Sequence, residues 1–284
     1  MFNENILILT KNLVASGSNS DIFEIDVIDS VVETKRNFIF NVAVSNKSRD
    51  FIRNLVAKVS PNLSLIEIEI LRNARINKIS FIAGMEGHSV SMLNNSCVLL
   101  NRAQRDLDSI HTPITPETQV HLTKFFSSVL EYFKSINTVY CDWKPANILE
   151  YSTNEFKLTD FGSCLENNRT VAHPCNINAI YCSPYLMNIV KEICPKFRDD
   201  LIGVAYVFMK LKGIQLPWAT LRPNILDYKT DFCRVERVIY AIKIDEKINR
   251  FNLEKTTLPN EYKNCIANIY QDFQFSNNQN ISFI

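Results

Sequence analysis

Residues 139–149 read VYCDWKPANIL, and residues 156–162 read FKLTDFG. The first stretch places three polar side chains, Asp142, Lys144 and Asn147, in one loop between apolar residues. Such a loop can hold a carboxylate that accepts a proton, a lysine that neutralises anionic charge and an amide oxygen that binds a metal ion. Phosphoryl transfer requires these three parts, so the loop is a candidate site for that chemistry.

A second carboxylate follows at Asp160, at the start of the turn formed by residues 160–162. The chain that precedes it is long enough for a hairpin, which would return Asp160 toward the loop. Asn147 and Asp160 then provide the oxygen ligands that Mg²⁺ prefers. We expect Asp142 to accept the proton of the attacking hydroxyl and Lys144 to neutralise the moving phosphoryl group.

Both stretches resemble the protein kinases, whose catalytic loop reads H-R-D-x-K-x-x-N and whose metal loop reads D-F-G. Tyr140 and Cys141 replace the His and Arg of that loop. In the family this Arg usually pairs with a phosphorylated activation segment, so its loss implies activity without that phosphorylation. The resemblance also implies a bilobal α+β fold, with a small β-rich N-lobe that carries one helix and a larger α-helical C-lobe.

A narrower resemblance covers residues 198–218, where Arg-Asp-Asp-Leu opens an apolar helix and Leu-Pro-Trp follows. This pattern is similar to the central large-lobe helix of the casein kinase 1 and vaccinia-related kinase group. The resemblance implies that Asp200 tethers the backbone of the catalytic loop, which is a structural role. The Asn- and Ile-rich, Gly-poor composition is typical of an AT-rich genome, and with this resemblance it favours a large DNA virus as the source.

The spacing of apolar residues predicts where the elements of the two lobes lie. Strands are expected at residues 6–14, 21–28, 38–44, 55–59 and 97–100, and helices at residues 65–76, 116–133, 201–212, 236–248 and 261–273. We therefore predict a single kinase-like domain over residues 1–284, with an N-lobe of about 1–100, a hinge of about 101–104 and a C-lobe of about 105–284.

The phosphate-binding loop is predicted at residues 14–23, which resemble the family's glycine-rich loop G-S-G-S-F-G-D-I-Y. Gly17 is retained, but Ala15 and Ser20 stand where the outer two glycines would be. Side chains at these positions keep the backbone farther from phosphates, so weaker phosphate binding is expected.

Two segments compete for the strand that carries the ATP-binding lysine. Residues 42–45 read VAVS and contain no lysine, whereas residues 56–59 read VAKV and lead directly into an acidic helix. The resemblance therefore assigns Lys58 to the α- and β-phosphates of ATP and Glu67 as its ion-pair partner. This choice makes residues 26–54 an insertion before the lysine strand.

The adenine-binding hinge is predicted at residues 97–103, which read CVLLNRA. In the resembling family the backbone of this segment binds adenine. Leu100, Asn101 and Ala103 are the positions assigned to the nucleotide, with Leu100 at the back of the pocket.

The composition excludes several other kinds of protein. The chain has 31 Lys and Arg against 30 Asp and Glu, and this balance argues against direct nucleic-acid binding. Its 8 cysteines form no C-x-x-C pair, so no zinc site is expected. The chain has no basic leader and no apolar run of about 18 residues. We therefore expect an intracellular protein without a membrane span.

The sequence thus predicts a Ser/Thr protein kinase that uses ATP and Mg²⁺ to phosphorylate protein substrates. Lys144, two residues after Asp142, is the Ser/Thr-type pattern of the resembling family. One alternative is a pseudokinase that binds partners through an intact fold, which the altered glycine-rich loop favours. A small-molecule kinase of the aminoglycoside or choline type is a further alternative. The sequence DFG at residues 160–162 and the sequence DDL at residues 199–201, where a helix begins, argue against it.

Overall fold

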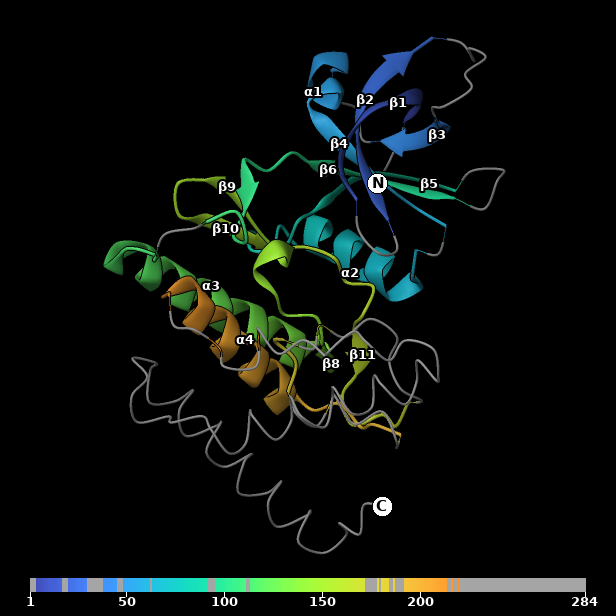
Figure 1. Cartoon of the computed structure of the whole chain (residues 1–284). Coiled ribbons are helices and arrows are strands. Elements are labelled where there is room, and N and C mark those ends of the chain that lie inside the picture. The colour runs from blue at the N-terminus through green and yellow to red at the C-terminus, as the bar shows by residue number, and fades with distance from the viewer. Residues whose placement is uncertain are drawn as a thin grey trace, which may run out of the picture. The chain divides into compact units, whose positions relative to one another are not determined.

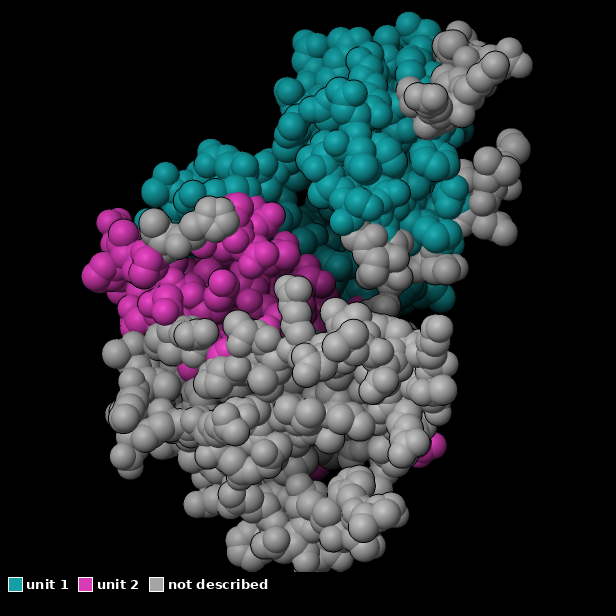
Figure 2. Space-filling model, viewed as in Figure 1, with its two compact units in different colours: residues 1–105, 149–162 teal, residues 106–148, 163–284 magenta. Residues whose placement is uncertain are grey.

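The computed structural model describes residues 4–16, 20–29, 38–44, 48–61, 63–90, 95–110, 113–171, 178, 180–183, 186, 192–213, 216 and 219. The chain divides into two compact units, which Figure 2 colours separately. Unit 1 comprises Met1–Arg105 and Leu149–Gly162, and unit 2 comprises Asp106–Ile148 and Ser163–Ile284. Helices and strands both occur, as an α+β chain requires. The helices expected at residues 236–248 and 261–273 lie outside the described residues.

Unit 1 is built on a closed antiparallel barrel in the strand order β1-β2-β4-β6-β5-β3 (Figure 1). Its strands are β1 (Glu4–Ser16), β2 (Asp21–Ile28), β3 (Ile39–Val44), β4 (Leu55–Ser60), β5 (Met85–Val90) and β6 (Ser96–Asn101). The apolar side chains of these strands form one buried core, to which Ile8, Phe40, Val42, Ala57 and Leu99 belong. All five strands expected from the sequence are present.

The segment predicted as an insertion, residues 26–54, contains β3 and the short helix α1 (Arg49–Arg53). β3 pairs with β1 on one side and with β5 on the other, so it is the strand that closes the barrel. Ser48 caps α1 by accepting a hydrogen bond from the backbone N of Phe51, and Ile52 is buried in the barrel core. The described parts of the insertion, residues 26–29, 38–44 and 48–54, are therefore part of the folded unit.

β5 is the one strand of the barrel that the sequence did not predict. Its central residues, Gly87, His88 and Ser89, lack the apolar alternation typical of a strand. Gly87 lies against β3, and a Cβ atom there would stand 2.8 Å from a methyl of Val42 and 2.9 Å from a methyl of Val44. The glycine therefore provides the space that β3 needs to pack against β5.

Unit 1 also contains the helix α2 (Leu65–Ile76), whose buried face includes Ile70, Leu71 and Ala74. A separate three-stranded sheet has the order β10-β9-β7. Its strands are β7 (Arg105–Asp106), β9 (Ile148–Ser152) and β10 (Glu155–Leu158). β10 carries the chain directly to the turn at residues 160–162.

In unit 2, α3 (Pro116–Ser135) and α4 (Phe197–Leu211) lie side by side, and their Phe126 and Phe208 rings are 6.1 Å apart (Figure 1). β8 (Thr138–Val139) pairs with β11 (Leu165–Glu166), and the 3-10 helix η1 spans Pro145–Asn147. α4 begins before the expected residue 201, because the Asp199 carboxylate accepts from the backbone N of Lys196 at 2.8 Å and caps the helix. None of the helices among the described residues is long and apolar enough to cross a membrane.

The closure of the barrel generates a first prediction. Gly87→Ala should lower the free energy of unfolding by about 1–3 kcal/mol, because the new methyl overlaps two valine side chains of β3. Gly84→Ala is the matched control, since the nearest atoms to its Cβ, those of Arg75, are 4.0 Å away. That control should change the free energy by less than about 0.5 kcal/mol. Equal effects of the two variants in urea denaturation would contradict the packing argument.

Candidate active site

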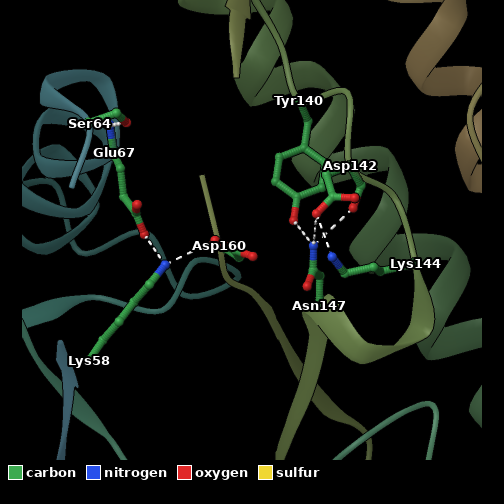
Figure 3. A network of polar contacts seen from close by, with 8 residues as sticks. All are labelled: Lys58, Ser64, Glu67, Tyr140, Asp142, Lys144, Asn147 and Asp160. Atoms are coloured by element: carbon green, nitrogen blue, oxygen red, sulfur yellow. Dashed lines mark hydrogen bonds and ion pairs between the residues drawn. The ribbon is translucent and has the colours of Figure 1, made fainter. Parts of the chain in front are cut away.

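Lys58 lies in β4, a strand in which every residue is buried. Its ammonium donates to Oε1 of Glu67 at 2.6 Å and to Oδ1 of Asp160 at 2.9 Å (Figure 3). Burial alone would lower the pKa of Lys58, but the two carboxylates outweigh burial and raise it. The lysine therefore keeps its positive charge inside unit 1.

Glu67 occupies the first turn of α2, and the residue that caps this helix determines where the Glu67 side chain lies. The hydroxyl of Ser64 accepts from the backbone N of Glu67 at 3.1 Å, and this cap fixes the start of the helix. The Glu67 side chain is 4% exposed. The structure thus brings together the lysine and the glutamate that the sequence assigned to each other, whereas Glu69 lies on the exposed side of the helix.

Asp160 follows β10 with a backbone φ of +62°, in the left-handed region that non-glycine residues seldom adopt. Two contacts hold this turn in place. The Asp160 carboxylate accepts from Lys58, and the next backbone amide, that of Phe161, donates to Glu67. The Asp160 side chain is nevertheless 43% exposed, so the carboxylate is both anchored and accessible.

Unit 2 contains the other predicted polar residues, with Asp142 and Lys144 in the loop between β8 and η1 and Asn147 at the end of η1 (Figure 3). Oδ2 of Asp142 accepts from Nζ of Lys144 at 2.6 Å and from Nδ2 of Asn147 at 2.9 Å. Nδ2 of Asn147 also lies 2.9 Å from the backbone O of Asp142. Asp142 and Asn147 are buried, while the Lys144 side chain is 27% exposed. The Asp142 carboxylate therefore contacts both an ammonium and an amide.

The backbone of this loop is held by Asp200, in the first turn of α4. The Asp200 carboxylate accepts from the backbone N of Tyr140 at 2.8 Å, from the backbone N of Cys141 at 3.0 Å and from Nε1 of Trp143 at 2.9 Å. Cys141 has a φ of +67°, which is strained for a residue with a side chain. Burial raises the pKa of Asp200 to about 7, although the three donors oppose that rise.

The predicted phosphate-binding loop is described only in part. Gly17 lies outside the described residues. Ala15 is exposed near the end of β1, and Ser20 is half-buried just before β2. The assignment of this loop to phosphates therefore stays a prediction.

The predicted hinge lies at the end of β6. Leu100 is buried, and Ala103 is half-buried after the strand ends. The backbone O of Asn101 accepts from the Tyr151 hydroxyl at 3.1 Å, and the side-chain Nδ2 of Asn101 donates to Oε1 of Glu86 at 3.3 Å. Both of these Asn101 contacts are within unit 1. Binding of adenine by Leu100, Asn101 and Ala103 also stays a prediction.

Sequence reasoning did not assign two polar contacts of the catalytic loop. Tyr140 was interpreted as a replacement for His, but its hydroxyl accepts from Nδ2 of Asn147 at 2.9 Å. Trp143 carries no assigned role in the motif, but its indole N–H donates to Asp200. The available signal was chemical, since a buried Tyr or Trp has one polar atom that requires a partner.

A second prediction concerns Gly203, in the interior of α4. A Cβ atom there would stand 2.8 Å from Cβ and Cδ1 of Trp143, so Gly203→Ala must displace the indole that donates to Asp200. Helix propensity alone predicts that Gly203→Ala stabilises the protein by about 1 kcal/mol. We expect a loss of about 1–3 kcal/mol instead, because a helix already packed against the ring has no room for a methyl. Urea denaturation gives the sign of the change in unfolding free energy. A gain in stability would contradict the packing argument, and a loss would support it.

Comparison with known proteins agrees with this geometry. A family model described as "Protein kinase domain" matches residues 41–271, which is more than half of the chain. Over 56 residues the chain is 45% identical to the serine/threonine-protein kinase Sgk1-B of Xenopus laevis. That match covers 20% of this chain and 12% of the relative's length. On the strength of the family match, the chain belongs to the protein kinase domain family.

Proposed function

We propose that this protein kinase transfers the γ-phosphoryl group of ATP, with Mg²⁺, to Ser and Thr hydroxyls of protein substrates. The observation that carries the proposal is Lys58, a charged side chain that is 6% exposed and contacts both Glu67 and Asp160. A buried ion pair is a weak source of stability, because the desolvation of its charges offsets their attraction. Its presence is better explained by the binding of an anion such as the phosphates of ATP.

Each described cluster contributes a different part of the chemistry. In unit 1, Lys58 binds the α- and β-phosphates, and Glu67 holds Lys58 in place. In unit 2, Asp142 orients the attacking hydroxyl and accepts its proton, and Lys144 neutralises the phosphoryl group as it moves.

The chemistry of the donors fits Mg²⁺, which prefers carboxylate and amide oxygens. Asp160 has a part-exposed carboxylate of which one oxygen contacts Lys58. Asn147 uses its NH₂ group for contacts within the loop, so its amide oxygen is the atom available to a cation. These two residues would hold the metal, which when bound neutralises phosphate charge.

Lys144 and the match to a kinase named as serine/threonine-specific support the choice of Ser and Thr over Tyr. The pattern of residues 198–218 supports a place near the casein kinase 1 and vaccinia-related kinase group. With the composition, it also supports a virus-encoded protein that acts inside a cell.

We also propose that activity does not require phosphorylation of the segment after residue 162. Cys141 stands where the resembling family has an Arg, and it is buried in an apolar cluster with Val139, Cys182, Leu186 and Ile193. An apolar cluster cannot pair with a phosphate in the way that an Arg does. Packing of these apolar side chains would hold the segment instead.

A pseudokinase is the second candidate, and the observation that favours it is the side chains at Ala15 and Ser20. If these side chains prevent phosphate binding, the fold serves only to bind partners. The Lys58, Glu67 and Asp160 contacts oppose this candidate, because a protein that binds no nucleotide has no evident need for them.

The direct test incubates the protein with labelled ATP, Mg²⁺ and a generic acidic protein substrate. Asp160→Asn and Lys58→Met should each lower phosphorylation by about a hundredfold or more, since the first removes a carboxylate ligand of Mg²⁺ and the second removes the cation that binds the phosphates. Lys47→Met is the matched control, because residue 47 follows the competing strand segment, and it should retain activity. Full turnover by Asp160→Asn would contradict the metal assignment, and loss only in Lys47→Met would contradict the lysine assignment.

Thermal shift separates the enzyme from the pseudokinase. A non-transferable ATP analogue at 100 times its dissociation constant should stabilise the folded protein by about 2.7 kcal/mol. We expect weak binding that depends strongly on Mg²⁺, because the metal compensates for the missing glycines of the phosphate loop. No shift at millimolar analogue, with or without Mg²⁺, would favour the pseudokinase.

A further inference from the structure

Tyr140 is fully buried, and its ring packs against two aromatic residues, one that precedes it in the chain and one that follows it. Its ring centroid lies 5.6 Å from that of Phe133, on α3, and 5.1 Å from that of Trp143. The ring therefore has little freedom to rotate, and its hydroxyl has a defined position. That position is 2.9 Å from Nδ2 of Asn147 (Figure 3).

The contacts of Asn147 determine which end of its amide faces the loop. Two of the atoms around Nδ2 belong to Asp142. Its backbone O can accept a hydrogen bond but not donate one, and the same holds for Oδ2 when the carboxylate is ionised. The Tyr140 hydroxyl is the third acceptor. The NH₂ end is therefore held toward these three oxygens, and Oδ1 is held away from them. No described residue donates a hydrogen bond to Oδ1.

From this arrangement we infer that Tyr140 is a positioning residue, which together with Asp142 holds the Asn147 amide in the orientation that presents Oδ1 to a divalent cation. The inference rests on the proposed function, because it concerns the same metal-binding residue. It goes further in giving a role to a position where the resembling family has a His. Tyr140 acts only through Asn147 and touches no reacting atom.

Tyr140→Phe tests the inference, because it removes the hydroxyl and keeps the ring that packs against Phe133 and Trp143. The matched control is Tyr132→Phe, which removes a phenolic hydroxyl from α3 in the same unit, where the ring packs against Phe133. The probe is Mn²⁺ in the presence of a non-transferable ATP analogue, followed by electron paramagnetic resonance. The melting temperature without metal is measured in parallel, so that unfolding is not mistaken for loss of metal binding.

We expect Tyr140→Phe to weaken Mn²⁺ binding by about threefold to tenfold, the effect of losing one neutral hydrogen bond. Tyr132→Phe should bind Mn²⁺ as the wild type does. In the Asn147→Ala background, Tyr140→Phe should have no further effect, because the residue through which it acts is gone. A purely structural role would weaken binding equally in both backgrounds.

Two results would overturn the inference while leaving the proposed function intact. One is unchanged Mn²⁺ binding by Tyr140→Phe, and the other is an equal loss with and without Asn147. If the wild type binds neither Mn²⁺ nor the ATP analogue, the inference and the proposed function fail together. The wild-type measurement thus distinguishes the two failures.

Discussion

The buried carboxylate of Asp200 is the contact on which the geometry of the catalytic loop depends. It accepts from two successive backbone amides, those of Tyr140 and Cys141, and so holds Cys141 in a left-handed conformation that the residue would not adopt alone. The next residue is Asp142, whose direction follows from that turn. A change on α4 therefore alters the loop even where it touches none of the residues assigned to chemistry.

In unit 1 the main constraint is a different one, because an ammonium group must stay charged in a buried strand. Lys58 remains protonated because Glu67 and Asp160 provide two carboxylates, and each is fixed by its own backbone: Glu67 by the cap at Ser64, and Asp160 by a left-handed turn. The charge at this position is thus defined before any ligand binds. Such preorganisation lowers the cost of binding an anionic ligand.

The sequence predicted the parts of the fold and site that depend on local pattern. Five strands, α2 and the Lys58–Glu67 pair followed from apolar alternation, an acidic helix and a family motif. The closure of the barrel did not, because a period of two marks β3 as a strand but does not identify β1 and β5 as its partners. The Tyr140 contact with Asn147 was also missed, since its direction depends on a ring of α3 that packs only in the folded chain.

The closed barrel also limits how unit 1 associates with other chains. Each of its six strands has a hydrogen-bonded neighbour on both sides, and two residue pairs, Ala43 with His88 and Val44 with Gly87, join β3 to β5. Along the paired stretches an extended peptide or a second copy cannot add a strand, which limits the usual route of edge-to-edge aggregation. A protein that recognises these paired stretches must contact side chains on the outer surface of the barrel, and the insertion imposes that condition because it supplies β3.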